Sequence, residues 1–306
     1  MLLQRFTNFV LRSRLHAVGT AFVLSLAPLF GASVGILVAT FITLRKGAFE
    51  GALVLCVTIA ASLLNYALSS AAAQPQVVTV VIATIIAINI LTWLLALVLR
   101  RYENWNLVLD VAILTGLVFV FVVHFVFPGI QNEWNTQLTA YLNKTASVFE
   151  QLAPDAAGQE EMQASMVASI KPYLTGFVIA SIVFNALFQL VLARWWQAIV
   201  FNPGGLRREL HQIRLSYVSA SVFIAVLGLA YIGNAFGLDM LPMMVVAFCA
   251  AGLSLIHRML ASNKTGWFWL LLVYLGIMFV FPAGMVLVAI AGLLDSLFNL
   301  RLRFKN

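Results

Sequence analysis

Residues 15–44 read LHAVGTAFVLSLAPLFGASVGILVATFITL, thirty residues without a charged side chain apart from His16. A single helix of that length would be roughly 45 Å long, whereas the hydrocarbon core of a bilayer is about 30 Å thick. Pro28 and Gly31 interrupt the block near its middle. Proline removes a helical hydrogen bond and favours the first turn of a new helix. The block therefore predicts two short helices joined by a turn.

A second long block, residues 267–298, reads WFWLLLVYLGIMFVFPAGMVLVAIAGLLDSLF and has one charged residue, Asp295. Pro282 interrupts it, so the same argument predicts two short helices. Six further apolar blocks have the length of one membrane span: 48–70, 77–99, 105–127, 170–193, 215–236 and 240–260. Together the eight blocks predict an all-α, polytopic transmembrane helical bundle of eight to ten helices.

The composition agrees with a membrane protein. The chain has 306 residues, of which 62% are hydrophobic and 9% charged, whereas a soluble domain has about 25% charged residues. The formal net charge is +7. The basic residues lie at the ends of the hydrophobic blocks, which is the pattern of membrane topology. We therefore expect the lipid bilayer as a partner, and no nucleic acid.

The basic residues also distinguish one helix from two in each long block. If each long block is a single span, only eight of the eighteen Lys and Arg residues share the side of the termini. If each block folds back on itself, sixteen share that side, and only Lys144 and Lys171 lie on the other. Cytoplasmic segments carry an excess of Lys and Arg, so we expect folded blocks and both termini in the cytoplasm. The pattern leaves open whether these blocks cross the membrane fully or are re-entrant.

This topology divides a single integral-membrane domain, residues 1–306, into segments. We expect an amphipathic interfacial helix, two sets of membrane helices on either side of an amphipathic extracytoplasmic cap, and a basic cytoplasmic segment. Their ranges are 1–14 for the interfacial helix, 15–128 and 170–306 for the helix sets, 129–169 for the cap and 201–214 for the basic segment. The expected location is an inner (cytoplasmic) membrane, which the chain crosses several times.

Small residues recur every four positions in the first long block and continue beyond it: Ala27, Gly31, Gly35, Ala39, Gly47 and Gly51. Such a face lets helix backbones approach closely in lipid. It is a candidate docking face for another membrane subunit. Packing within the bundle is the alternative, and it is the more common use of such faces.

A few polar residues interrupt the membrane helices: Asn65, Asn89, His124, Asn185 and Gln189. They are candidates for lining a ligand cavity, and hydrogen bonding between helices is the alternative. Asn185 and Gln189 are one helical turn apart and share a face. The pattern predicts no buried carboxylate in the middle of a span, which argues against a proton- or sodium-coupled carrier.

The basic segment 201–214 contains Arg207, Arg208, His211 and Arg214. We expect it to face lipid headgroups or a partner, and a phosphate site is the alternative. The two cysteines lie in apolar runs, and no Cys/His cluster occurs, so no metal and no cofactor are predicted. The chain contains no HExxH, GxSxG or Walker A sequence, so we do not expect an enzyme.

Four stretches carry a resemblance to a known family: APLFG at 27–31, LRKGAFEG at 44–51, FNPGGLRRELHQIR at 201–214 and GLLDSLFNLR at 292–301. They resemble the YybS-like predicted bacterial membrane proteins, a family of unknown function. That family in turn resembles the substrate-binding S components of energy-coupling-factor transporters. The resemblance implies a helical bundle that holds a small molecule and docks on a transport partner, with Gly31, Gly35 and Ala39 in the position of the docking face.

The first functional hypothesis is therefore S-component-like binding or transport of a small-molecule ligand, in a bundle cavity near Asn185 and Gln189. A non-catalytic scaffold or assembly factor is the second hypothesis. The third is an intramembrane enzyme that acts on a lipid-linked substrate. It needs converging acidic residues at one interface, which the sequence does not offer.

Overall fold

The computed structural model describes residues 2–27, 31–69, 75–144, 156–261 and 265–302, and every regular element in these ranges is a helix. The helices of the first half are α1 (Leu2–Leu11), α2 (Arg14–Ser25), α3 (Gly31–Lys46), α4 (Ala48–Ser69), α5 (Pro75–Tyr102), α6 (Trp105–Val126) and α7 (Ile130–Lys144). Those of the second half are α9 (Ala156–Ile170), η1 (Lys171–Tyr173), α10 (Leu174–Phe201), α11 (Gly205–Leu210), α12 (Tyr217–Tyr231), α13 (Ala235–Leu260), α14 (Gly266–Phe279), α15 (Ala283–Phe298) and η2 (Leu300–Leu302). The prediction of an all-helical bundle is confirmed.

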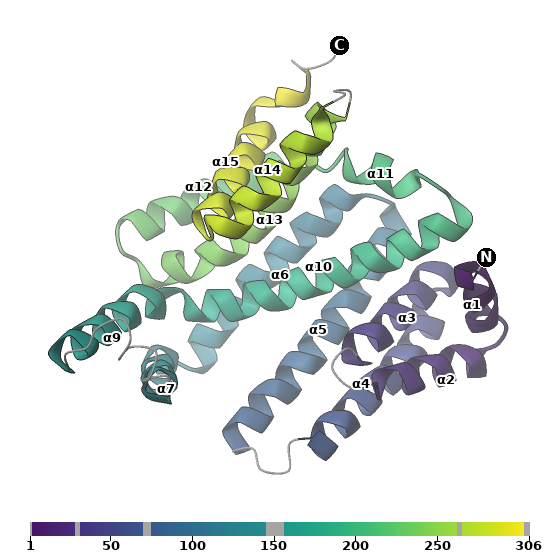
Figure 1. Cartoon of the computed structure of the whole chain (residues 1–306), viewed down its shortest axis with the longest axis horizontal. Coiled ribbons are helices and arrows are strands. Elements are labelled where there is room, and N and C mark those ends of the chain that lie inside the picture. The colour runs from purple at the N-terminus through teal and green to yellow at the C-terminus, as the bar shows by residue number, and fades with distance from the viewer. Residues whose placement is uncertain (1, 28–30, 70–74, 145–155, 262–264, 303–306) are drawn as a thin grey trace.

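Five of the described helical segments are long and apolar enough to cross a membrane, and they centre on α4, α5, α6, α10 and α13. This supports a multi-pass membrane protein. Three other apolar helices, α12, α14 and α15, are shorter. The long helices α5, α6 and α10 run side by side through the middle of the molecule (Figure 1).

Each of the two long hydrophobic blocks forms two helices, as the prolines predicted. In the first block, α2 packs against α3, and in the second, α14 packs against α15. Pro282 directly precedes α15, whereas Pro28 lies outside the described residues. The 12 residues of α2 and the 16 of α3 are roughly 18 and 24 Å long. Both helices are therefore shorter than a hydrocarbon core of about 30 Å.

The block at 215–236 differs from its prediction as a single span. Its helix, α12, has only 15 residues, roughly 22 Å. The helix ends before Gly233, which has a φ of 74°, a left-handed conformation that glycine adopts easily. Asn234 then caps α13 by accepting a hydrogen bond from the Gly237 N–H. As a result, α13 begins at Ala235, five residues before the predicted start at 240.

Polar contacts bring several distant chain segments to one end of the bundle. The Lys46 ammonium donates to the Leu11 carbonyl at 3.0 Å, and Arg100 donates to the Thr43 carbonyl at 2.9 Å. We call this the basic end, because α3, α5, α10, α13 and α15 all finish there in or beside Lys and Arg residues. The N-terminus and α11 lie together on one side of the molecule, and α7 and α9 lie on the opposite side (Figure 1).

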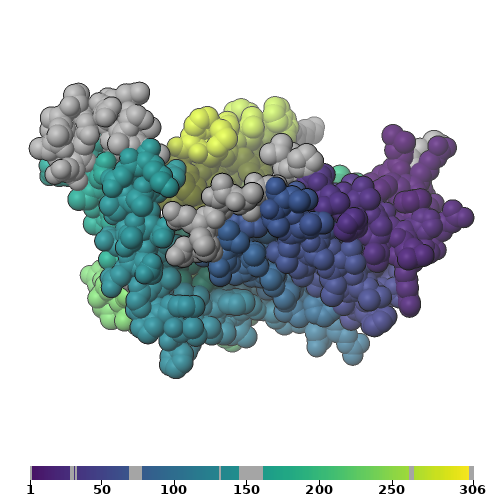
Figure 2. Space-filling model, turned by 90° about the horizontal axis from the view of Figure 1, so that it is seen from below, coloured from purple at the N-terminus to yellow at the C-terminus, as the bar shows by residue number. Residues whose placement is uncertain are grey.

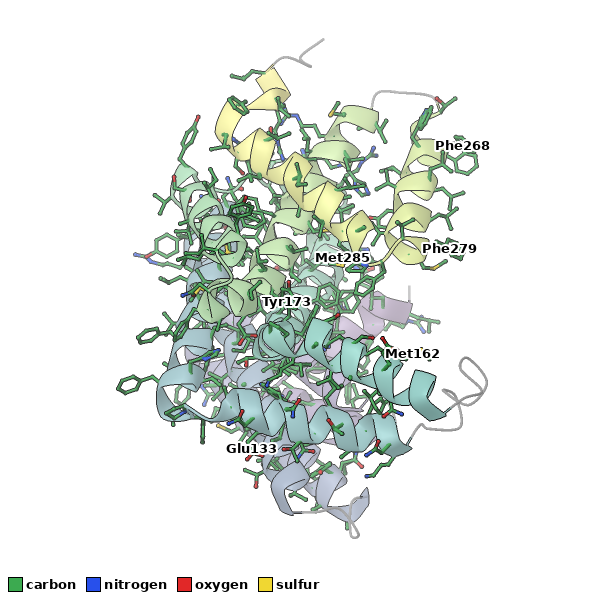
Figure 3. All side chains as sticks on the ribbon, turned by 90° about the vertical axis from the view of Figure 1, so that its left-hand side faces the viewer. Glu133, Met162, Tyr173, Phe268, Phe279 and Met285 are labelled. Carbon is green, nitrogen blue, oxygen red and sulfur yellow. The ribbon has the colours of Figure 1, made fainter. Side chains whose placement is uncertain are left out.

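The predicted cap, residues 129–169, contains α7 and α9, which pack against each other. Glu133 on α7 and Met162 on α9 mark the two neighbouring helices in Figure 3. The Trp134 indole donates to the Thr175 hydroxyl at 2.9 Å, which ties α7 to the start of α10. In Figure 2, α7 and the N-terminal helices lie at opposite ends of the molecule.

Helix α1 is anchored to the bundle by Trp196 of α10. The Trp196 indole donates to the Thr7 hydroxyl at 2.7 Å, and its ring stacks on Phe6 at 5.6 Å and on Phe41 at 4.2 Å between centroids. One face of the predicted interfacial helix is therefore buried against α10 and α3.

Candidate functional site

A half-enclosed groove of about 980 Å³ lies near the basic end. Its walls come mainly from α10, α11, α13 and α14, with Trp105 and Leu109 contributed by α6. They are mainly apolar, and Val191, Leu253 and Leu270 are among the lining residues. The volume is at the upper end of the range for small-molecule sites, about 300–1,000 Å³.

The groove exists because α14 stands away from α10. Helix α14 packs on α13 and α15 and makes no comparable contact with α10. Its outer face is apolar, and Phe268 and Phe279 point away from the molecule (Figure 3). On the inner face, Trp267, Leu270 and Tyr274 line the groove. They are spaced by three and four residues, which is the repeat of one helix face.

The polar side chains of the groove include two histidines and a tyrosine. The Nδ1 of His257 lies 2.8 Å from the Leu253 carbonyl. A carbonyl can only accept, so Nδ1 carries the proton and the other nitrogen, Nε2, is left to accept. The Tyr274 hydroxyl lies 3.4 Å from this Nε2. The ring of His211 lies 6.4 Å from that of His257 between centroids. The histidine pair thus joins α11, α13 and α14 across the groove.

The charge around His211 is positive. Burial lowers the pKa of His211 from its usual 6.5, and the neighbouring basic groups, with Arg207 first among them, lower it further. The imidazole is therefore neutral at neutral pH. None of the described residues that line the groove is Asp or Glu.

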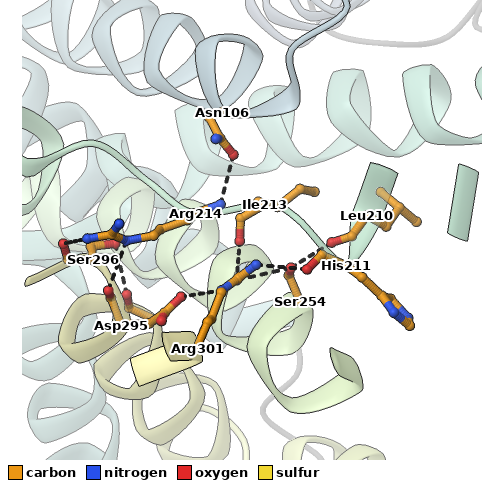
Figure 4. A network of polar contacts seen from close by, with 10 residues as sticks. Asn106, Leu210, His211, Ile213, Arg214, Ser254, Asp295, Ser296 and Arg301 are labelled. Atoms are coloured by element: carbon orange, nitrogen blue, oxygen red, sulfur yellow. Dashed lines mark hydrogen bonds and ion pairs between the residues drawn. The ribbon is translucent and has the colours of Figure 1, made fainter. Parts of the chain in front are cut away.

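Behind the groove, Arg301 of η2 is buried and holds several backbone groups in place (Figure 4). It donates to the carboxylate of Asp295 at 2.7 Å, to the His211 carbonyl at 2.8 Å and also to the Ile213 carbonyl. Ser254, which lines the groove, accepts from Arg301 at 3.2 Å and donates to the Leu210 carbonyl at 2.6 Å. This network fixes the segment after α11 against α13 and α15.

The structure separates the predicted basic segment into two parts. Arg207 and Arg208 are exposed on α11, as a lipid- or partner-facing segment requires. Arg214 instead points inward, where it donates to the carbonyls of Asp295 at 3.1 Å and Ser296 at 2.9 Å. His211 lies between these two parts and lines the groove.

Glu209 attaches α11 to the rest of the bundle. Its carboxylate accepts from Arg194 on α10, at 2.5 and 3.0 Å, and from the Trp105 indole on α6 at 2.9 Å. Burial raises the pKa of Glu209, but the hydrogen bonds from Arg194 and Trp105 and the charge of Arg194 outweigh it, so the pKa lies below 4.5. The negative charge of Glu209 is therefore already compensated by Arg194 within the chain.

The five polar residues predicted to line a cavity lie elsewhere, and none of them lines the groove. Asn89 is buried and donates to the Ile85 carbonyl of its own helix at 2.8 Å. Gln189 is buried, with Oε1 unpaired among the described residues, whereas Asn185 on the same helix is half-buried. Asn65 donates to the Ser25 carbonyl at 3.5 Å.

The fifth of these residues, His124, forms a buried pair with Asp239. The Nε2 of His124 lies 2.7 Å from one oxygen of Asp239, and the other oxygen accepts from the Gly176 N–H at 2.9 Å. Asp239 is completely buried and belongs to α13, a candidate membrane span. The prediction concerned the middle of a span, whereas Asp239 is a buried carboxylate about one turn after the start of α13. The sequence signal for this buried carboxylate was a lone acidic residue at the edge of a hydrophobic block.

The described part of the small-residue face packs inside the chain. A side chain at Gly35 would overlap the Ser25 hydroxyl, one at Gly31 would overlap the Ser25 carbonyl, and one at Gly51 would overlap Thr43. Ala39 is buried. In the described residues, this face therefore brings α3 close to α2 and α4.

Comparison of the chain with protein-family models, with curated proteins and with solved structures finds no match in any of the three. The resemblance to YybS-like proteins and S components stays a prediction. The groove is therefore the feature of the molecule that supports a function. Sequence reasoning missed His257, Tyr274 and Trp267; for the two on α14 no sequence signal was available, because that helix is apolar on every face.

Proposed function

We propose that this multi-pass membrane protein binds an amphipathic small molecule in the groove between α10, α11, α13 and α14. The observation that carries the proposal is the combination of about 980 Å³ of mainly apolar space with a polar cluster at His211, His257 and Tyr274. A long apolar body is favoured along such walls, and the polar groups fix its orientation.

In this proposal the basic end faces the cytoplasm, with both termini on that side. This orientation is supported by the Lys and Arg residues that cluster at this end, because cytoplasmic segments carry an excess of such residues. Trp195 and Trp267 line the groove and are more than half exposed, which fits an aromatic belt at the membrane surface. The ligand would then enter from the cytoplasmic leaflet.

The proposal retains the class of activity that the S-component resemblance implies, but it moves the site from Asn185 and Gln189 to the groove. A transport partner, a bacterial inner membrane and a chain without enzymatic activity belong to the same proposal. A scaffold or assembly role is the weaker alternative, because the described small residues that were to form its docking face pack within the chain.

Binding can be tested by filling the groove. Ala250 lines it, and Ala250→Phe should reduce the affinity for an uncharged dansylated alkyl amide, measured by fluorescence in nonionic detergent. Ala83→Phe is the matched control, because Ala83 is exposed on α5. Equal probe affinity in the wild type and both variants would overturn the proposal.

A further inference from the structure

We infer that the ligand of the groove carries an acidic oxyanion head group, a carboxylate or a phosphate, which lies beside Arg207 and His211. This inference rests on the proposed function and specifies the chemistry of its ligand. The observation behind it is an excess of positive charge at one end of an otherwise apolar site.

The cations at this end lack compensation within the described chain. Arg207 lines the groove, and Arg258 lies close enough to act on His211 electrostatically. Neither forms an ion pair with another described residue. Charges of one sign beside a low-dielectric groove repel each other strongly, and an anionic head group would relieve that repulsion.

Two nearby acids, Asp295 and Glu209, each already form an ion pair with an arginine of the chain. Asp295 pairs with Arg301 at 2.7 Å, and Glu209 accepts from Arg194 and Trp105. The positive charges of Arg207 and Arg258 therefore remain available to a ligand.

His211 is suited to respond to such a head group. Its ring makes no hydrogen bond with another described residue and lines the groove, whereas His257 is held by the Leu253 carbonyl and by Tyr274. The titratable groups that act on His211 are Arg207, His257, Arg258 and Arg301, all basic. An anion among them favours the protonated imidazole, so an acidic ligand should bind more tightly at pH 6 than at pH 8.

The test compares ligands that share the same alkyl chain length and differ in their head groups. Tetradecanoate, tetradecyl phosphate, tetradecanol and tetradecyltrimethylammonium would compete with the dansylated alkyl amide on the full-length protein. We expect the two acids to bind roughly tenfold or more tightly than the alcohol, because charge-assisted hydrogen bonds have that strength. The ratio between tetradecanoate and tetradecyl phosphate then identifies the preferred acid.

Substitutions locate the preference. Arg207→Gln and Arg258→Gln should each reduce the advantage of the acids over tetradecanol. Arg208→Gln is the matched control, because Arg208 is exposed on the same helix but does not line the groove.

Two failures are distinguishable. If all four ligands bind with equal affinity and Ala250→Phe lowers the affinity for each of them, the groove binds amphiphiles without regard to the head group. The inference about the acidic head group is then overturned. The same holds if Arg208→Gln removes the preference as fully as Arg207→Gln. If Ala250→Phe changes the affinity for none of the four ligands, the proposed function itself is overturned.

Discussion

The Nε atom of Arg301 lies 2.7 Å from Oδ2 of Asp295, and the two side chains are only 5% and 1% exposed. Arg301 also donates to backbone carbonyls 88 and 90 residues earlier in the chain. This buried pair therefore fastens η2 and α15 to the segment after α11, beside the groove. Its removal should affect both the stability of the protein and the shape of the groove.

Arg301→Ala should reduce the free energy of unfolding by about 3–5 kcal/mol, because the substitution leaves a buried carboxylate without its partner. Asp295→Asn should reduce it less, since an amide oxygen can still accept from Arg301. Thermal and chemical unfolding in detergent measure both effects. Arg208→Ala, on an exposed arginine, is the control, and a loss as large as that of Arg301→Ala would contradict the interpretation.

Asp239→Ala should destabilise the end of the bundle opposite the basic end. The substitution removes the acceptor of the buried Gly176 N–H and the partner of His124, which should cost roughly 3 kcal/mol. Hydrogen–deuterium exchange should increase at the start of α10 more than at its end. Glu133→Ala, on exposed α7, should leave that exchange unchanged. A uniform increase along α10 would show that the pair has no local role.

Gly35→Ala should destabilise the protein by roughly 1–3 kcal/mol, the usual effect of overpacking. The added methyl group would overlap the Ser25 hydroxyl and approach the Thr58 methyl to 3.0 Å. Gly19→Ala is the control, because the space around Gly19 is open, and it should be neutral or slightly stabilising. Adding Ser25→Ala should restore part of the loss. If Gly35→Ala leaves stability unchanged, the contact between α2 and α3 is looser than described.

The free energy of unfolding of the ligand-free protein should decrease as the pH falls from about 7 toward 5. The pKa of His211 is lowered below 6.5 in the folded state. In that window the unfolded chain therefore binds more protons, and stability rises with pH. The contribution of His211 is present above pH 6.5 and is lost as the pH falls through the two pKa values. His211→Gln should flatten this slope in denaturant titrations at several pH values. If the free energy of unfolding depends on pH equally in the wild type and in His211→Gln, this role of His211 is contradicted.

Cysteine labelling tests the proposed orientation. In a variant whose Cys56 and Cys249 are replaced by alanine, Tyr102→Cys at the basic end should react with a membrane-impermeant maleimide only after the cells are opened. Lys144→Cys on α7 should react in intact cells. Both positions are exposed. Labelling of both from the same side would overturn the orientation.

The helices were largely predictable because their signals are local. Pro282 separates α14 from α15, and a proline interrupts a helix whatever surrounds it. The boundary between α12 and α13 was predicted less well. It depends on the left-handed turn at Gly233 and the cap at Asn234, which lie inside an apolar run. The predicted start of α13 at 240 left Asp239 outside the helix, whereas a start at Ala235 buries it.

The groove was not predictable in the same way. It depends on how far α14 stands from α10, and that distance is set by packing between helices remote in the sequence. Ser254 and His257 illustrate the difficulty. Their spacing has no meaning as a catalytic motif, yet both line the groove. By contrast, the sequence was sufficient to single out residues 201–214 as an unusual polar segment.

The partners of the segment after α11 impose an order on biosynthesis. The carbonyls of His211 and Ile213 receive hydrogen bonds from Arg301, which a ribosome adds 90 and 88 residues later. Until then these carbonyls have only water or other transient donors. The segment after α11 therefore gains these contacts only after α12, α13, α14 and α15 have been made, and a chain stalled before η2 lacks them.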